Sequence, residues 1–306
     1  MQSLPASEPT SAMRGRMYVL AAAVLWSLGG LFGKSLALDP LTIAFYRGLF
    51  AGLILLPFVP RSRRVLRPAM LPLTINFGMM TGFYLGAMKT TTAANAIFLQ
   101  CTSTLWTIPL SLLVLRDLPD RRAVSGIGLA SIGIVAIVLY GYDGRPNEGQ
   151  GIAFGLASGI GYAIATIGLR GLRDLDPTWL SAVNNLGGSL ALGAWILVTR
   201  GSLVVPSVSH LSLLLVFGAV QMAIPYALFA RGLREVDAPE ASLIGLLEPV
   251  LNPLWVALFL SEYPAPATVI GGLFLLSGVA VRFLPGRSQV SVSPSSLESI
   301  PIDDAG

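Results

Sequence analysis

The chain has 306 residues, of which 54% are hydrophobic and only 12% charged, and its mean hydropathy is +0.72. A charged fraction of about 25% is usual for soluble proteins, so this chain has too little polar surface to cover a water-facing globule. Composition therefore predicts an integral membrane protein and argues against a soluble enzyme.

The net charge of +4 and the pI near 9.5 do not indicate nucleic-acid binding, because the basic residues lie in short segments between apolar runs. The chain has one cysteine, Cys101, and one histidine, His210. These permit neither an internal disulfide nor a cysteine metal cluster. We expect no metal site and no cofactor.

Ten apolar runs are long enough to cross the hydrocarbon core, which needs roughly 20 residues of helix. We predict spans at Met17–Leu36, Leu41–Phe58, Leu71–Met88, Ala93–Leu115, Ala123–Tyr140, Gly151–Leu172, Pro177–Val198, Leu211–Ala230, Ala241–Leu260 and Ala265–Phe283. Helix is the predicted state of each because it pairs its own backbone groups within lipid. The expected fold is an all-α polytopic membrane protein with ten transmembrane helices.

The distribution of lysine and arginine predicts the orientation of these spans. With the amino terminus inside, fifteen basic residues are cytoplasmic, and four, Lys34, Lys89, Arg145 and Arg200, are external. Cytoplasmic loops carry an excess of such residues in membrane proteins. We therefore expect both termini to be cytoplasmic and the membrane to be the bacterial cytoplasmic (inner) membrane.

The two halves of the chain align when one is shifted by 145 residues. This shift places Lys89 on Arg234, Ala93 on Ala238, Ala96 on Ala241, Asp117 on Glu262, Pro119 on Pro264, Gly126 on Gly271 and Gly133 on Gly278. Slightly smaller shifts place Asp39-Pro40 on Asp176-Pro177 and Lys34 on Arg170. Each half contains five spans, an odd number, so the second copy enters the membrane inverted.

The loop charges give a separate indication of inversion. Four arginines follow the second span and one, Arg200, follows the seventh; three follow the fourth span and none follows the ninth. The alternative is that the two halves resemble each other only because both are rich in apolar residues. We predict these domains: 1–16 a cytoplasmic tail, 17–140 the first five-helix repeat, 141–150 an external linker, 151–284 the second repeat and 285–306 a disordered cytoplasmic tail.

Several motifs resemble the EamA domain of the drug/metabolite transporter superfamily. They are Ala22-Ala23-Val24-Leu25-Trp26-Ser27 with Lys34, Pro40 and Arg47, then Ala87-Met88-Lys89-Thr90-Thr91-Thr92-Ala93-Ala94-Asn95-Ala96, and Leu247-Glu248-Pro249-Val250 with Glu262 and Gly271. The resemblance covers residues 17–284 and implies two inverted five-helix repeats around a central cavity, usually with export of small metabolites. The chain departs from the pattern at Trp26-Ser27-Leu28, and Ser103-Thr104 stands where the second half has Glu248-Pro249.

Arg47 and Glu248 are the two charged residues well inside predicted spans. A charge near the membrane centre costs about 2.5–3.5 kcal/mol on insertion scales, so it usually faces a partner or a water-filled cavity. Arg47 is a candidate to hold a substrate carboxylate or phosphate or to pair with Glu248, and the alternative is that it snorkels to the outer interface. Glu248 lies deeper, and Asn252, four residues on, shares its helix face.

Pro249 and Pro253 each remove a backbone hydrogen bond from the ninth span, at the depth of Glu248. A broken helix there would face an aqueous path, and the alternative is a simple kink. Other spans carry polar or aromatic residues at middle depth. The predicted substrate-binding residues are Arg47, Glu248, Asn252, Trp26, Tyr84, Gln100, Tyr162, Asn184 and Gln221.

Apolar faces with a few hydrogen-bonding groups suit small amphiphilic solutes such as amino acids. The sequence therefore predicts a secondary transporter, in the exporting direction, that uses alternating access at a midplane cavity. The alternatives are a passive channel or facilitator and a membrane-embedded enzyme acting on lipid-linked substrates. Expected partners are the small-molecule substrate, membrane lipid and a coupling proton carried by Glu248, with no nucleic acid and with a monomeric or homodimeric state.

Overall fold

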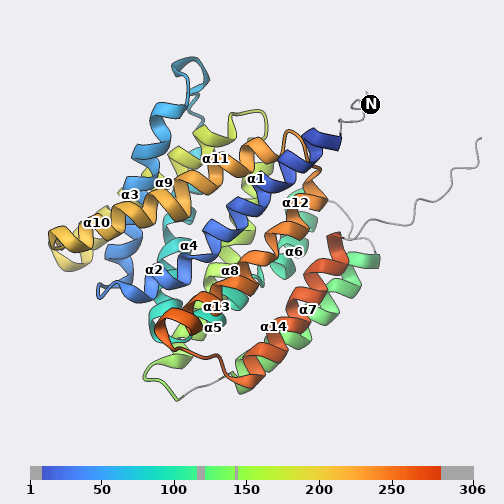
Figure 1. The fold of residues 1–306 in the computed structure, drawn as a ribbon. Coiled ribbons are helices and arrows are strands. Elements are labelled where there is room, and N and C mark those ends of the chain that lie inside the picture. Colours follow the sequence, from blue (N-terminus) through green and yellow to red (C-terminus); the bar gives the residue numbers. More distant parts are fainter. Residues whose placement is uncertain (1–8, 116–120, 142–143, 284–306) are drawn as a thin grey trace, which may run out of the picture.

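The computed structural model describes residues 9–115, 121–141 and 144–283, and the regular elements within these ranges are all helices (Figure 1). In chain order they are α1 (Pro9–Ser27), α2 (Gly29–Ser35), α3 (Pro40–Leu55), short turns at Leu56–Phe58 and Arg61–Arg63, α4 (Met70–Thr90), α5 (Ala93–Gln100), α6 (Ser103–Leu115), α7 (Arg121–Tyr140), α8 (Glu148–Arg170), α9 (Pro177–Arg200), α10 (Val208–Phe217), a π-helical segment (Gly218–Ala223), α11 (Ile224–Gly232), α12 (Ala238–Gly245), α13 (Leu247–Leu260) and α14 (Pro266–Phe283).

The chain is an integral membrane protein. Seven helical stretches in the described residues are long and apolar enough to cross a membrane, and two shorter apolar helices cover Ser125–Tyr140 and Pro266–Val281. Each of the ten predicted segments coincides with one helix or with consecutive helices. The first begins earlier than expected, at Pro9, and its added turns carry Arg14 and Arg16, which form ion pairs with Glu235 and Glu240.

Two helices, α3 and α9, begin with the same local signal. Asp39 caps α3 by accepting hydrogen bonds from the backbone N–H groups of Leu41 and Thr42. Asp176 caps α9 in the same way, and each aspartate precedes a proline at the first helical position. Capping satisfies backbone donors that the first turn leaves free, and proline there has no N–H to satisfy.

Helices α3 and α9 pack against each other in antiparallel orientation. The start of α3 meets the end of α9, where Arg200 pairs with Asp39 at 3.1 Å. At the other end Arg63, which follows α3, pairs with Asp176 at the start of α9 at 3.2 Å. Helix α4 packs on both α9 and α8, and α1 packs on α11 (Figure 1).

Helices α7 and α14 form a second antiparallel pair at one side of the bundle (Figure 1). Glycine permits their backbones to touch: a Cβ on Gly133 would lie 2.3 Å from the carbonyl oxygen of Gly271, and one on Gly278 would lie 2.4 Å from that of Gly126. Small residues allow such close approach in membranes, where no water drives helices together.

Two predicted spans are interrupted at matching places. The fourth breaks between α5 and α6, at Cys101 and Thr102, and the ninth breaks between α12 and α13, at Leu246. The break in the ninth span precedes Pro249, whose missing N–H leaves the carbonyl of Gly245 without its usual partner four residues on. The ninth span thus bends at one residue, Leu246, whose backbone stays in the right-handed helical region.

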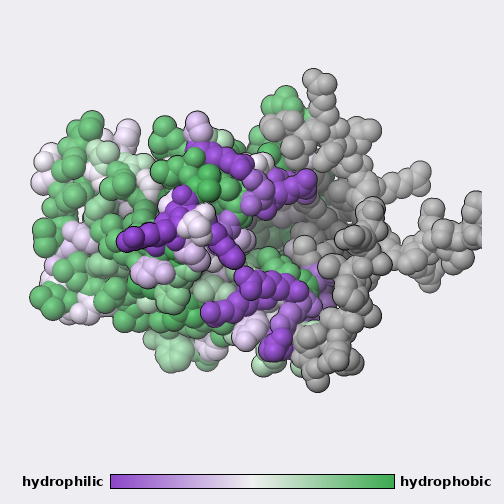
Figure 2. Space-filling model, turned by 90° about the horizontal axis from the view of Figure 1, so that it is seen from above, coloured by the Kyte–Doolittle hydropathy of each residue, from purple (hydrophilic) through white to green (hydrophobic). Residues whose placement is uncertain are grey.

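The bundle has two ends that differ in charge. We call one the Arg170 end; it holds the start of α1 and the α3–α4, α8–α9 and α11–α12 connections. We call the opposite one the Arg145 end. Seen from above, a band of hydrophilic side chains crosses the face and hydrophobic residues cover much of the remainder (Figure 2). This pattern fits a protein whose polar loops leave the lipid at its ends.

Candidate functional site

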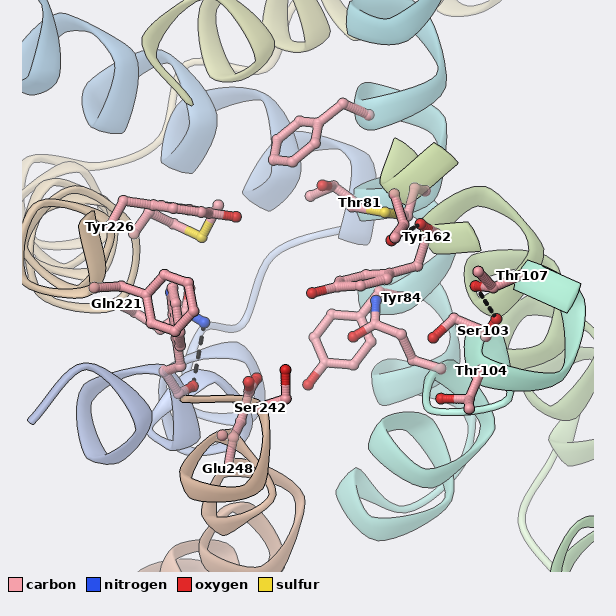
Figure 3. Close-up of a pocket in the computed structure, with 18 of the residues that line it drawn as sticks. Thr81, Tyr84, Ser103, Thr104, Thr107, Tyr162, Gln221, Tyr226, Ser242 and Glu248 are labelled. Atoms are coloured by element: carbon pink, nitrogen blue, oxygen red, sulfur yellow. Dashed lines mark hydrogen bonds between the residues drawn. The ribbon is translucent and has the colours of Figure 1, made fainter. Parts of the chain in front are cut away.

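A cavity of about 540 Å³ lies inside the bundle (Figure 3). Its volume falls in the range of about 300–1,000 Å³ that is usual for small-molecule sites. Side chains from both halves of the chain line it: Trp26, Arg47, Phe77, Met80, Thr81, Tyr84, Gln100, Ser103, Thr104, Thr107, Tyr162, Thr166, Arg170, Gln221, Met222, Tyr226, Phe229, Ala241, Ser242, Gly245 and Glu248.

Arg47 is the cationic residue in the deep part of this cavity, and only 3% of it is exposed. Its Nη1 donates a hydrogen bond of 3.2 Å to Oε1 of Gln221, and its guanidinium carbon lies 5.0 Å from the ring centre of Phe217. Its Nε has no hydrogen-bond partner among the described residues. The alternative in which Arg47 snorkels to the interface is therefore wrong, because α10 and the π-helical segment enclose it.

Gln221 owes its position to the π-helical segment Gly218–Ala223. Such segments are rare within α-helices and occur frequently at functional sites. The Gln221 side chain points into the cavity (Figure 3), where it accepts from Arg47 and donates through Nε2 to the carbonyl oxygen of Trp26 at 3.2 Å. A neutral amide thus satisfies one Arg47 donor and leaves the positive charge uncompensated.

Glu248 lies on the first turn of α13, directly after the helix break. Its side chain points into the cavity beside Ser242 (Figure 3). Within the described part of the chain it forms neither a hydrogen bond nor an ion pair, and the pairing with Arg47 that the sequence left open is absent. The cavity therefore presents a carboxylate and a guanidinium that are both available to a third group.

Aromatic rings form much of the remaining wall. Trp26 contacts Tyr226 edge to face at 5.3 Å between ring centres, and it contacts Phe229 at 5.2 Å. Tyr84 and Tyr162 approach from the side opposite Gln221 and Tyr226 (Figure 3). The site joins apolar faces to a small number of polar groups, which is the usual composition of a small-molecule pocket.

The lining residues show where the cavity ends. On α8 they are Tyr162, Thr166 and Arg170, spaced by one turn and ending at the last residue of the helix. No residue of α8 between Glu148 and Gly161 lines the cavity. The cavity therefore runs from mid-helix toward the Arg170 end.

Seven of the nine predicted substrate-binding residues line this one cavity: Arg47, Glu248, Trp26, Tyr84, Gln100, Tyr162 and Gln221. The other two are not among the residues that line it. Asn184 is buried on α9, which packs between α3 and α4 and contributes nothing to the lining. Asn252 is fully buried against α2, where a Cβ on Gly30 would lie 2.3 Å from its Oδ1.

The sequence analysis missed several hydroxyl side chains of the cavity wall, namely Thr81, Ser103, Thr104, Thr107, Thr166 and Ser242. Helical spacing would have indicated some of them, since Thr81 lies three residues before Tyr84 and Thr166 four after Tyr162. Threonine and serine are common in membrane helices as packing residues, so their type alone gives no signal.

The chain also matches the model of a known protein family. The family model of EamA-like transporters matches the chain twice, at residues 13–139 and at residues 149–284. The boundary between the two matches falls in the connection between α7 and α8, so each match contains one of the two interrupted spans.

The chain is similar over most of its length to proteins described as transporters. An uncharacterized transporter of Archaeoglobus fulgidus is 28% identical over 88% of this chain and 96% of its own. The uncharacterized inner membrane transporter YicL of Salmonella typhimurium is 23% identical over 90% and 97%. A chain of known crystal structure shares the fold with a TM-score of 0.64 at 20% identity, covering 92% of this chain and 100% of its own.

Proposed function

Since the chain belongs to the EamA-like transporter family, we propose that it is a secondary transporter that exports small amphiphilic metabolites such as amino acids. The observation that carries this proposal is the cavity of about 540 Å³ with Arg47 and Glu248 in its wall. A zwitterionic solute carries both charges that these groups attract, and its apolar part can contact Trp26 and Tyr226.

The mechanism we propose is alternating access by two inverted five-helix repeats, residues 17–140 and 151–284. Matching breaks at Cys101-Thr102 and at Leu246 support it, because paired interruptions in two halves are typical of transporter binding sites. In this proposal Glu248 also binds the coupling proton, since it is the carboxylic acid among the cavity-lining residues.

The proposed location is the bacterial inner membrane with both termini cytoplasmic, as the excess of basic residues at the Arg170 end favours. The name of the Salmonella relative supports the inner membrane. In this orientation the cavity opens to the cytoplasm, where an exporter binds its substrate. We propose a monomer or homodimer.

Counterflow in proteoliposomes tests this proposal. Vesicles loaded with a high concentration of one unlabelled amino acid should accumulate the labelled form transiently, because a carrier exchanges substrate across the membrane. A channel or facilitator without alternating access shows no such trans-stimulation. Absence of counterflow for every solute that stabilises the purified protein in a thermal-shift screen would refute the transporter proposal.

A further inference from the structure

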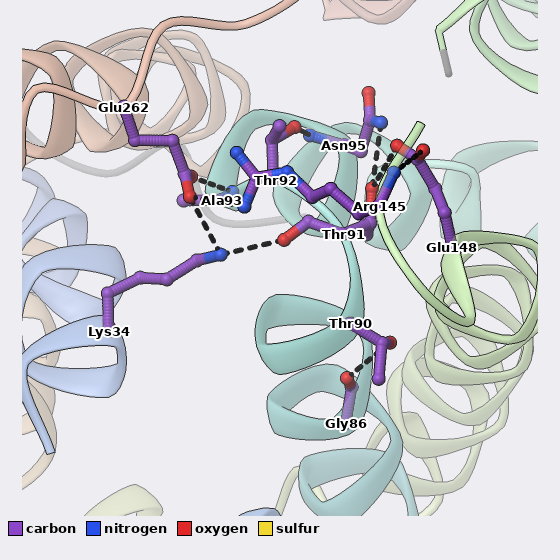
Figure 4. Close-up of polar contacts among 10 residues, drawn as sticks. All are labelled: Lys34, Gly86, Thr90, Thr91, Thr92, Ala93, Asn95, Arg145, Glu148 and Glu262. Carbon is purple, nitrogen blue, oxygen red and sulfur yellow. Dashed lines mark hydrogen bonds and ion pairs between the residues drawn. The ribbon is translucent and has the colours of Figure 1, made fainter. Parts of the chain in front are cut away.

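A cluster of charged groups lies at the Arg145 end (Figure 4), whereas the cavity runs toward the Arg170 end. The carboxylate of Glu262 accepts from Lys34 Nζ at 2.9 Å, from Arg145 Nη1 at 2.9 Å and from the backbone N–H of Ala93 at 2.8 Å. The Lys34 and Glu262 side chains are only 12% and 13% exposed. One carboxylate thus joins α2, the start of α5, the α7–α8 connection and the α13–α14 connection.

Hydrogen bonds extend this cluster across the same end. Lys34 also donates to the carbonyl oxygen of Thr91 at 2.7 Å, and the Thr91 hydroxyl donates to Glu148 at 3.3 Å. Asn95 donates to Thr91 and to the carbonyl oxygen of Gly141 and accepts from Thr268 on α14. The network therefore connects segments of the first half of the chain to segments of the second.

Apolar side chains fill the space between this cluster and the cavity. On α4, Tyr84 lines the cavity, Leu85 and Met88 are completely buried, and Lys89 donates to the carbonyl oxygen of Leu36. Leu36 itself is completely buried. Five residues of helix span about 7.5 Å, so only a thin layer of apolar side chains separates the cavity from the charged cluster.

We propose that Glu262 holds a gate closed at the Arg145 end, and that Lys34 and Arg145 must leave it before the cavity opens to that side. This inference rests on the proposed transport function. Glu262 belongs to the second half and binds Lys34 and Ala93 of the first half, so the two halves cannot separate at this end while these contacts hold. Removing one partner of a buried ion pair costs more stability than removing one partner of an exposed pair, because the remaining charge stays buried without its partner.

The protonation of Glu262 is consistent with a gate that stays closed at neutral pH. Burial by itself would raise the pKa of this carboxyl, but the Ala93 N–H and the charges of Lys34 and Arg145 hold it below its ordinary value. The carboxylate is therefore ionised at neutral pH, and rearrangement of the helices opens the gate.

Labelling of a single cysteine in the cavity tests the gate without any substrate. Ser103→Cys places a thiol of similar size on the cavity wall, in a Cys101→Ala background of the full-length chain. A membrane-impermeant maleimide is applied to vesicles of either orientation. We expect Glu262→Gln to speed labelling from the Arg145 side about tenfold and to slow it from the Arg170 side, since the change shifts the population between two states.

Glu235→Gln is the matched control, because Glu235 pairs with Arg14 at the Arg170 end. It should leave labelling from the Arg145 side unchanged. Glu262→Asp keeps the charge and should stay within about twofold of the parent protein. Thermal unfolding of each purified variant verifies that it is folded.

Unchanged labelling in folded Glu262→Gln would overturn the gate, as would an equal increase in Glu235→Gln. Because the readout needs no transported solute, it separates this inference from the proposed function. Failure of counterflow together with the expected labelling change would refute the proposed transport function and retain a closure at the Arg145 end. Normal counterflow without the labelling change would support the transport function and refute the gate.

Discussion

Asp39 and Asp176 make the same two kinds of contact at opposite ends of one antiparallel helix pair. Each caps its own helix and pairs with an arginine beside the far end of the other. Asp39 pairs with Arg200, the last residue of α9, and Asp176 pairs with Arg63, which follows α3. The glycine contacts between α7 and α14 are reciprocal in the same way. Gly126 aligns with Gly271 and Gly133 with Gly278, and in the structure Gly126 contacts Gly278 while Gly133 contacts Gly271. These reciprocal contacts support the proposed inverted repeat, because a two-fold axis in the membrane plane produces them.

The first prediction concerns Glu248. We expect Glu248→Gln to abolish transport and its pH dependence while the protein stays folded, because the amide can neither bind a proton nor attract a substrate cation. Flux in proteoliposomes at several pH values measures this. Glu235→Gln, which changes an acid outside the cavity, is the control. Unaltered flux and pH dependence in Glu248→Gln would reject the role.

The second prediction concerns Arg47. Arg47→Ala should raise KM for a carboxylate-bearing substrate by about tenfold or more, because a charge-assisted hydrogen bond contributes about 1.5–3 kcal/mol. A neutral analogue of the same size should be transported with a nearly unchanged KM. Equal loss for both solutes would mean that Arg47 maintains the structure instead of binding the anion.

Gln221 provides the third prediction. In Gln221→Glu a carboxylate would lie at the 3.2 Å contact with Arg47 and neutralise it. We expect affinity for anionic and zwitterionic solutes to fall about tenfold, since the internal ion pair competes with the substrate. Gln100→Glu adds the same charge elsewhere in the wall. If both variants lose affinity equally, the added charge is responsible and the pairing is not.

The fourth prediction tests the α7–α14 contact. Gly133→Ala should destabilise the protein by about 1–3 kcal/mol, because its methyl group would overlap the backbone of Gly271. Gly128→Ala on the same helix has no heavy atom within 4 Å of the new Cβ and should leave the melting temperature unchanged or raise it. Thermal unfolding in detergent measures both, and equal melting temperatures would contradict the contact.

The fifth prediction concerns pH and Asp176. Burial alone would raise the pKa of this carboxyl, but the Trp179 N–H, Arg63 and the Thr178 N–H hold it below its ordinary value. A lowered pKa means that the ionised cap stabilises the fold above the unfolded-state pKa of about 3.9, and that this contribution is lost as the pH falls through the lowered folded value.

Asp176→Ala should therefore cost about 1 kcal/mol of stability at pH 7. The difference from the parent protein should stay constant from pH 8 to about pH 5 and shrink in stronger acid. Melting temperatures across this range measure it, with the exposed Asp174→Ala as control. A difference that grows toward low pH would contradict the assignment.

The sequence by itself determined the helical class and the approximate positions of the helices, because apolar length and capping residues such as Asp39 act locally. Seven of its nine predicted binding residues line the cavity, since a charged or aromatic side chain at middle depth needs an interior position. Asn184 and Asn252 do not line this cavity, because polarity and depth do not fix which way a helix faces.

Only the tertiary structure decided which faces meet. Arg47 and Glu248 lie on separate helices far apart in the sequence, and nothing local predicts that Gln221 meets Arg47 where they converge. The same holds for Glu262. The sequence indicates only a loop residue, but in the structure its carboxylate binds Lys34, Arg145 and the N–H of Ala93 from distant segments. Such contacts depend on how whole helices pack, so the pattern of residues along one helix does not predict them.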